Sequence, residues 1–209
     1  MISRVLLPAV LLAATLATAV RAPGGDPESG RRKAEACAAC HGPGGDATTP
    51  GTPSIAGMPP IYTHWQLIMY RDGRRRDPQM SPIAEKMSDE DMADLAAYYA
   101  AQPPRRRPAR IDPQRAAAGA RVAQAQHCTS CHGAALLGQQ GVPRLAGQDF
   151  DYLMKRLRGY RTKTTSDLDG MMTMVSQSLS DEDIENLVHF MAGAPVGGPP
   201  SPDGRGGGG

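Results

Sequence analysis

Cys37-Ala38-Ala39-Cys40-His41 and Cys128-Thr129-Ser130-Cys131-His132 are two copies of one C-x-x-C-H pattern in a chain of 209 residues. Together they use all four cysteines of the sequence, and the second copy follows the first by 91 positions. Four cysteines in an exported protein usually form two disulfide bonds. Because every cysteine here belongs to one repeated motif, we do not expect disulfide bonds.

The chemistry of this motif points to covalently bound haem. Two thiols one helical turn apart can add to the two vinyl groups of a haem, and the histidine that follows reaches the iron from one face. A zinc site would need four thiols, or two thiols with histidines, whereas each half of the chain offers two cysteines and one adjacent histidine. We therefore expect two haem c groups, each containing iron. Their attachment points are Cys37, Cys40, Cys128 and Cys131, and the expected iron ligands are His41 and His132.

The segments that follow the two pentads also repeat. Pro53-Ser54-Ile55-Ala56-Gly57 corresponds to Pro143-Arg144-Leu145-Ala146-Gly147, and Ser88-Asp89-Glu90-Asp91 corresponds to Ser180-Asp181-Glu182-Asp183. Between these segments, Tyr62, Leu67, Tyr70 and Arg71 correspond to Tyr152, Leu157, Tyr160 and Arg161. This pattern indicates a tandem duplication. It divides the chain into a first domain over residues 20–101, a linker over 102–112 and a second domain over 113–192.

Both halves are predicted to be helical, because no run of alternating β-branched residues indicates a sheet. Each half should contain a helix from an Asp-Pro pair to the pentad (27–40 and 113–132), a middle helix (60–71 and 150–161) and a last helix that begins in a capping box at Ser88 or Ser180. The expected fold class is all-α. The residues expected in the buried helix faces are Ile61, Trp65, Ile68, Leu95, Ala96, Tyr99, Leu153, Leu157, Leu187, Val188 and Met191.

The ends of the chain and the linker have distinct compositions. Arg4 precedes an apolar stretch over residues 5–20, which contains Ala17 and Ala19 in the spacing of a processing site. We interpret residues 1–19 as a signal peptide, because this stretch is shorter than the roughly 20 residues that span a bilayer. The linker is rich in proline and arginine, so it should be extended and exposed. The tail over 193–209 is rich in glycine and proline, so it should be disordered.

The pentads, the P-x-[IL]-A-G segments and a methionine before each S-D-E-D segment resemble class I cytochromes c. Their duplication resembles the dihaem cytochrome c4 family, and it implies two tandem class I cytochrome c domains, each wrapped around a covalent haem. The resemblance implies that the carbonyls of Pro53 and Pro143 accept a hydrogen bond from the axial histidines. It also suggests haem propionate contacts from Tyr62, Trp65, Arg71, Tyr152 and Arg161. Because Arg156 stands where the first half has Gln66, unequal haem surroundings are expected.

The repeat selects the sixth iron ligands from several methionines. Met80 lies eight residues before Ser88, and Met172 lies eight residues before Ser180. Among the nearby methionines, those without a partner methionine in the other half are Met87, Met171 and Met174. We therefore expect Met80 and Met172 to bind iron, because thioether sulfur stabilises ferrous haem and raises its potential. Met171 stays an alternative to Met172 if the register slips by one residue.

Three histidines and two arginine runs remain. His127 precedes a pentad on the same helix, and His64 and His189 have no counterpart in the other half, so a bis-histidine site is not expected. The arginines at 74–76 and 105–107 form either a docking surface for an acidic partner or solvated loops. The formal net charge of +2 does not indicate nucleic acid as a partner.

These features together predict a periplasmic one-electron carrier with no catalytic residues. The resemblance implies that it passes electrons from a quinol-oxidising complex or dehydrogenase to a terminal oxidase or reductase, as a monomer that can associate peripherally with the membrane. The first alternative is a cytochrome subunit held permanently in a dehydrogenase or oxidase complex, which would have the same haem sites. The second is a dihaem peroxidase, which would need a displaceable sixth ligand.

Overall fold

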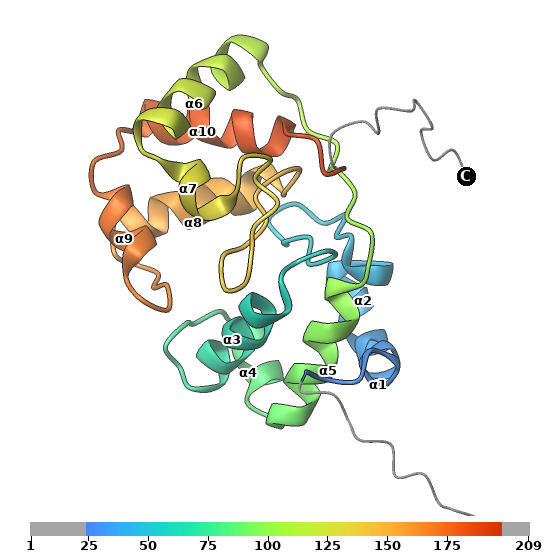
Figure 1. Ribbon diagram of the computed structural model, residues 1–209. Coiled ribbons are helices and arrows are strands. Elements are labelled where there is room, and N and C mark those ends of the chain that lie inside the picture. Colours follow the sequence, from blue (N-terminus) through green and yellow to red (C-terminus); the bar gives the residue numbers. More distant parts are fainter. Residues whose placement is uncertain (1–23, 198–209) are drawn as a thin grey trace, which may run out of the picture.

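Two helical domains follow each other along the chain, and a linker runs between them along one side of the molecule (Figure 1). The computed structural model describes residues 24–197. The signal peptide predicted over 1–19 and most of the predicted tail lie outside the described residues. No strand occurs within residues 24–197, so the predicted all-α fold class is confirmed.

The helices of the two domains correspond one to one, apart from the short 3₁₀ segments. The first domain contains α1 (Pro27–Lys33), η1 (Ala34–Cys37), α2 (Ala38–His41), η2 (Pro43–Gly45), α3 (Pro60–Arg71), α4 (Met80–Ala84) and α5 (Asp89–Ala100). The second domain contains α6 (Pro113–Ala125), α7 (Cys128–His132), α8 (Phe150–Arg161), α9 (Met171–Ser176) and α10 (Asp181–Gly193). The described residues therefore show the duplication that the sequence predicts.

The main helices begin at the predicted caps. The Asp112 carboxylate accepts hydrogen bonds from two backbone N–H groups of the first turn of α6, and Asp26 caps α1 in the same way with one. Ser88 and Ser180 form complete capping boxes with Asp91 and Asp183. These side chains satisfy N–H groups that have no partner inside the helix, so local sequence fixes where the helices start.

The helices that lead into the pentads differ from the prediction, because neither is a single regular α-helix. In the first domain the helix tightens into the 3₁₀ turn η1 before α2 begins. In the second domain α6 ends at Ala125, and His127 adopts a left-handed conformation with φ of 55° before α7. The structure also contains the short helices α4 and α9, which carry Met80 and Met172 and are not among the three helices predicted for each half.

Glycine allows the first and last helices of each domain to cross closely. A Cβ atom on Gly30 in α1 would lie 2.1 Å from the carbonyl oxygen of Asp94 in α5. A Cβ atom on Gly119 in α6 would lie 2.0 Å from that of Asn186 in α10. Since no real side chain fits at such distances, both crossings require glycine. Figure 1 shows α6 lying across α10 in this way.

The buried faces of the helices agree with the prediction except in α3. Thr63, Leu67, Met69 and Tyr70 are its buried residues, whereas Ile61 and Trp65 are 50% and 38% exposed. Ile61, Trp65 and Met69 are spaced by four residues and share one side of the helix, and only Met69 on that side is buried. The predicted burial of Ile61 and Trp65 is wrong, because apolar spacing alone does not show how much of a helix side the neighbouring elements cover. Ile68 is half-buried, and all the other residues predicted in buried faces are buried.

The two domains are joined by hydrogen bonds within and next to their P-x-[IL]-A-G segments. The side-chain amide of Gln148 accepts a hydrogen bond from the Ser54 N–H and donates one to the Ser54 carbonyl, each at 2.8 Å. Arg144, which is 1% exposed, donates to the Ala56 carbonyl at 3.0 Å. Asp149 accepts from the Gly51 N–H at 2.8 Å. The segments beside the two axial histidines thus contact each other directly.

The linker and the start of the tail are more ordered than predicted. Arg107 in the linker pairs with Asp149 at 3.1 Å, and its side chain is only 11% exposed, although most of the linker is exposed. In the predicted tail, Gly193 belongs to α10, and Ala194 and Val196 pack against the core of the second domain. The apolar side chains of Ala194 and Val196 explain this difference, because they bury surface that glycine lacks.

Candidate haem-binding sites

The two pentads present their cysteines in the same way. Cys37 and Cys128 are half-buried, Cys40 and Cys131 are exposed, and all four thiols are free. Burial raises the pKa of the Cys37 and Cys128 thiols. All four sulfur atoms are therefore available to form thioethers, as covalent attachment of haem requires.

Each pentad histidine is held by a proline carbonyl, as the sequence predicts. Nδ1 of His41 lies 2.9 Å from the Pro53 carbonyl oxygen, and Nδ1 of His132 lies 2.9 Å from that of Pro143. Burial lowers the pKa of both rings, which favours the neutral form. When Nδ1–H donates to the carbonyl, Nε2 is left with a free lone pair for a metal. The donor set fits an axial haem ligand in both domains.

The methionines Met80 and Met172 occupy matching positions. The N–H of Met80 donates to Asp77 at 3.2 Å, and the N–H of Met172 donates to Asp167 at 2.7 Å. Both side chains are half-buried and pack against the core of their own domain. By contrast, Met171 and Met174 are 49% and 61% exposed. Burial therefore favours Met172 over its neighbours, in agreement with the repeat.

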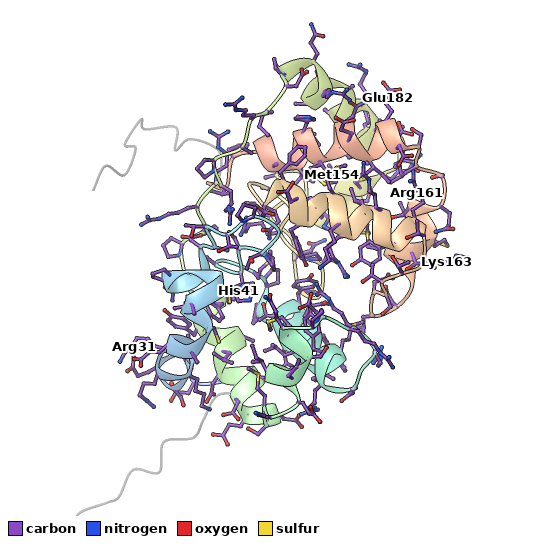
Figure 2. The ribbon with its side chains drawn as sticks, turned by 180° about the vertical axis from the view of Figure 1, so that it is seen from behind. Arg31, His41, Met154, Arg161, Lys163 and Glu182 are labelled. Atoms are coloured by element: carbon purple, nitrogen blue, oxygen red, sulfur yellow. The ribbon has the colours of Figure 1, made fainter. Side chains whose placement is uncertain are left out.

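Two of the expected propionate contacts have other partners. Arg71 donates to Asp89 at 2.6 Å and to the Met87 carbonyl at 3.5 Å. Arg161 likewise donates to Asp181 at 2.5 Å and to the Leu179 carbonyl at 3.1 Å. Both guanidinium groups thus hold the start of the last helix of their domain. This shared structural role explains why an arginine occurs at the same position in both halves. Figure 2 shows Arg161 on the second domain, far from His41 of the first.

The other three candidates divide between the surface and the domain interface. Trp65 is 38% exposed, and its ring makes an edge contact with His64 at 6.4 Å between centroids. Tyr62 and Tyr152 meet between the domains, where their hydroxyls are hydrogen-bonded. The hydroxyl of Tyr152 also accepts a hydrogen bond from Arg75 at 3.1 Å. The two tyrosines are half-buried and therefore belong to one polar cluster that both domains share.

The sequence analysis missed the two arginines of this cluster. Arg75 is buried, although its neighbours Arg74 and Arg76 are exposed, so the run at 74–76 is not uniformly a solvated loop. The guanidinium of Arg75 lies 4.5 Å from the centroid of the Tyr70 ring, and that of Arg156 lies 4.5 Å from the centroid of the Tyr160 ring. Tyr70 and Tyr160 correspond in the repeat, so the two guanidinium groups occupy matching places.

The two arginines that occupy these matching places come from different positions of the repeat. Arg75 donates to Gln66, and Arg156 donates to Thr165. Gln66 corresponds to Arg156, and Arg75 corresponds to Thr165. The arginine and its polar partner have therefore exchanged positions between the halves. The loop of the first domain thus supplies the guanidinium group that its helix lacks.

The remaining histidines have structural surroundings. His189 is buried, accepts a hydrogen bond from the Asp112 N–H at 3.2 Å and contacts the Phe150 ring. His127 is exposed at the break before α7. Within residues 24–197 no three His, Cys, Asp or Glu side chains are placed to hold one metal ion. This arrangement does not fit the zinc alternative.

Comparison with known proteins identifies the family of these sites. Residues 28–101 match the family Cytochrome c, and residues 114–191 match the family Cytochrome C oxidase, cbb3-type, subunit III. Cytochrome c4 of Thiocapsa roseopersicina is 36% identical to the chain, over 81% of the chain and 93% of that protein. The chain belongs to the cytochrome c4 family. It therefore carries two covalently bound haem c groups, one in each class I cytochrome c domain, as the pentads predict.

Further relatives agree with this assignment. The thiosulfate dehydrogenase electron acceptor of Stutzerimonas stutzeri (strain A1501) is 35% identical over 76% of the chain and 79% of that protein. The crystal structure of reduced recombinant cytochrome c4 from Pseudomonas stutzeri has a TM-score of 0.76 and 30% identity, covering 82% of the chain and all of that structure. Thiosulfate dehydrogenase (TsdBA) from Marichromatium purpuratum has a TM-score of 0.71 and 30% identity, covering 87% of the chain and 44% of that structure.

Loss of one pentad cysteine should affect one domain. We expect Cys128→Ala to deplete the second haem and to destabilise the second domain, because a small domain depends on its cofactor as part of its core. The measurement is the haem content per chain together with the thermal unfolding curve. Cys37→Ala is the matched variant for the first domain. A Cys128→Ala protein that keeps two covalent haems and unfolds as the parent does would contradict this expectation.

Proposed function

We propose that this dihaem electron carrier works in the periplasm, where it passes single electrons from a quinol-oxidising complex or dehydrogenase to a terminal oxidase or reductase. The observation that carries the proposal is that the two domains contain the same set of candidate haem-binding residues. Each contains two free cysteines, a histidine held by a proline carbonyl and a half-buried methionine held by an aspartate. Two equivalent redox sites in one chain suit the transfer of electrons between proteins.

The residues of each site keep the iron environment constant. A bound haem supplies an iron that alternates between the ferrous and ferric states. Pro53 and Pro143 fix the orientation of the histidine rings and raise their basicity. His41 with Met80, and His132 with Met172, are the residues that would hold the iron of the two haems. The buried side chains of the surrounding cores, including Met92 and Leu136, exclude water, and this limits reorganisation when the charge of the iron changes.

The proposed location rests on the predicted signal peptide and on the family. Within residues 24–197, no helix is long and apolar enough to cross a membrane. Maturation of the pentads by thioether formation also requires reduced cysteines before the haem is attached. We therefore place the mature protein in the periplasm as a monomer, free or peripherally associated with the membrane.

The main alternative is a role as a dedicated acceptor for one dehydrogenase. It is favoured by the likeness to thiosulfate dehydrogenase electron acceptors and to the thiosulfate dehydrogenase structure. The sites would perform the same chemistry, so only the partner differs. A dihaem peroxidase is less well supported, because both methionines pack against their cores and a peroxidase needs a site that opens.

A free electron carrier exchanges its protein partners, whereas a permanent subunit stays bound to one complex, and this difference can be tested. In a detergent-free periplasmic extract we expect the chain to elute as a free monomer with both haems bound. After reduction, the purified protein should be reoxidised by membranes that contain a terminal oxidase. Stable co-elution with a large flavin, quinone or copper subunit would contradict the carrier role and support the subunit alternative. A homologous cytochrome c4 provides the control for oxidase activity of the membranes.

A further inference from the structure

Gln148 of the second domain binds the peptide group that joins Pro53 to Ser54 in the first domain. The Ser54 N–H donates to Oε1 of Gln148 at 2.8 Å, and Nε2 of Gln148 donates to the Ser54 carbonyl at 2.8 Å. The Asp149 N–H also donates to Oε1, at 2.9 Å. Since two N–H groups point at the same atom, this atom must be the amide oxygen. The orientation of the Gln148 amide is therefore fixed.

The same peptide group holds the histidine of the first pentad. Its carbonyl oxygen, which belongs to Pro53, lies 2.9 Å from Nδ1 of His41. Its N–H, which belongs to Ser54, is the donor to Gln148. These groups form a continuous chain in which His41 donates to the peptide group and the peptide group donates to Gln148. Gln148 is 1% exposed and Ser54 is fully buried, so water does not compete for these hydrogen bonds.

The second domain does not contain an equivalent chain. The Pro143 carbonyl oxygen lies 2.9 Å from Nδ1 of His132. The N–H of that peptide group belongs to Arg144, and it has no hydrogen-bond acceptor within residues 24–197. The repeat counterpart of Gln148 is Met58, which has no amide. The contact is therefore one-sided, because a residue of the second domain acts on the histidine of the first domain.

Hydrogen bonds in such a chain strengthen one another. A peptide group whose N–H donates becomes more polar, so its carbonyl oxygen becomes a stronger acceptor. A stronger acceptor at Nδ1–H raises the basicity of the histidine ring. A more basic axial histidine gives more electron density to the iron and stabilises the ferric state, and this lowers the reduction potential. Burial increases the effect, because the local dielectric constant is low.

We propose that Gln148 is a positioning residue of the first haem site: it acts across the domain interface through the Ser54 N–H, fixes His41 and lowers the potential of the first haem. The inference rests on the proposed role of His41 as an iron ligand. It makes the two haems unequal, since the peptide group beside His132 lacks such a partner. It also makes the potential of the first haem depend on contact between the two domains.

Replacement of Gln148 by methionine in the protein with both haems bound tests this proposal. Methionine has nearly the same length and is the residue at the corresponding position of the first domain, Met58. We expect the potential of the first haem to rise and that of the second to stay unchanged. The measurement is a redox titration followed by NMR, which assigns each potential to its haem. In the ferrous variant, the Nδ1–H proton of His41 should also move upfield, while that of His132 stays in place.

Two further variants separate the hydrogen bond from general damage to the interface. Gln148→Glu keeps an acceptor for the Ser54 N–H, so the potential of the first haem should not rise. Gln102→Met is the matched control, because the half-buried amide of Gln102 donates to the Tyr98 carbonyl at 3.0 Å, which no pentad histidine contacts. Both potentials should stay unchanged in the Gln102→Met protein.

The unmodified protein provides a test that does not depend on folding of a variant. In its ferrous form, the Nδ1–H proton of His41 should resonate downfield of that of His132, because a stronger hydrogen bond deshields the proton. Equal resonances of the two protons would overturn the proposal.

The variants can overturn the proposal in three further ways. They do so if Gln148→Met keeps the parent potentials, if it raises the potential of the second haem, or if Gln102→Met has the same effect. His41→Ala tests the proposed iron ligand separately, and it should lose the first haem or change its spectrum. An unchanged first haem in His41→Ala would overturn the proposed site as well. Unchanged potentials in Gln148→Met, with a changed first haem in His41→Ala, would overturn only the role of Gln148.

Discussion

Replacement of Met172 by alanine should abolish half of the ferric sulfur-to-iron charge-transfer band and lower one reduction potential. The reason is that Met172 is the half-buried methionine of α9, held by Asp167 through its backbone N–H. Its thioether sulfur stabilises ferrous haem, so its loss favours the ferric state. Met80→Ala should abolish the other half of the band and lower the other potential. The measurement is the near-infrared region of the ferric spectrum, combined with a redox titration.

Met171→Ala is the matched control for this prediction. Met171 precedes Met172 in α9, but its side chain is 49% exposed and corresponds to Gln79 in the first domain. We therefore expect the full band in the Met171→Ala protein. If Met172→Ala keeps the full band while Met171→Ala loses half of it, the register of the second domain is wrong by one residue.

The substitution Gly119→Ala should strongly destabilise the second domain. The added Cβ atom would lie 2.0 Å from the Asn186 carbonyl oxygen and 2.5 Å from its carbon. Both are backbone atoms of α10, so α6 and α10 must separate to accommodate it. Overpacking of this kind costs about 1–3 kcal/mol and sometimes more, whereas alanine gains at most about 1 kcal/mol in helix propensity. The measurement is the midpoint of denaturant unfolding.

Gly141→Ala is the control for that substitution. A Cβ atom on Gly141 would meet only Ile61 at 3.9 Å, which is an ordinary van der Waals contact. We expect its unfolding midpoint to stay close to that of the parent. An equal midpoint for Gly119→Ala and the parent protein would show that the two helices can separate without cost, contrary to this account of the crossing.

The elements with strong local signals could be predicted from the sequence. The middle helices α3 and α8 have the predicted bounds, because Pro60 marks one start and the following apolar residues have helical spacing. The starts of α5 and α10 follow from capping boxes within four residues of sequence. The break before α7 could not be predicted, since a left-handed histidine at His127 has no distinctive local signal.

Side-chain surroundings that depend on tertiary contacts were harder to predict. The duplication indicated the candidate cysteines, histidines, prolines and methionines of both sites, because these residues repeat in register. Arg71 and Arg161 also repeat in register, and in the structure both hold the start of the last helix. The sequence analysis missed Arg75, whose equivalent charge comes from Arg156 at a different repeat position. The sequence did contain a signal for this exchange. Arginine and a polar residue swap places between the repeat pairs Gln66/Arg156 and Arg75/Thr165.

The haem content of the purified chain tests the central claim most directly. The protein is denatured, extracted with acidic acetone to remove any haem that is not covalently bound, and then assayed as the pyridine haemochrome. Because both pentads offer two free thiols and a correctly held histidine, we predict close to two haems per chain after extraction. Haem that passes into the acetone, or a content of one per chain, would contradict the account.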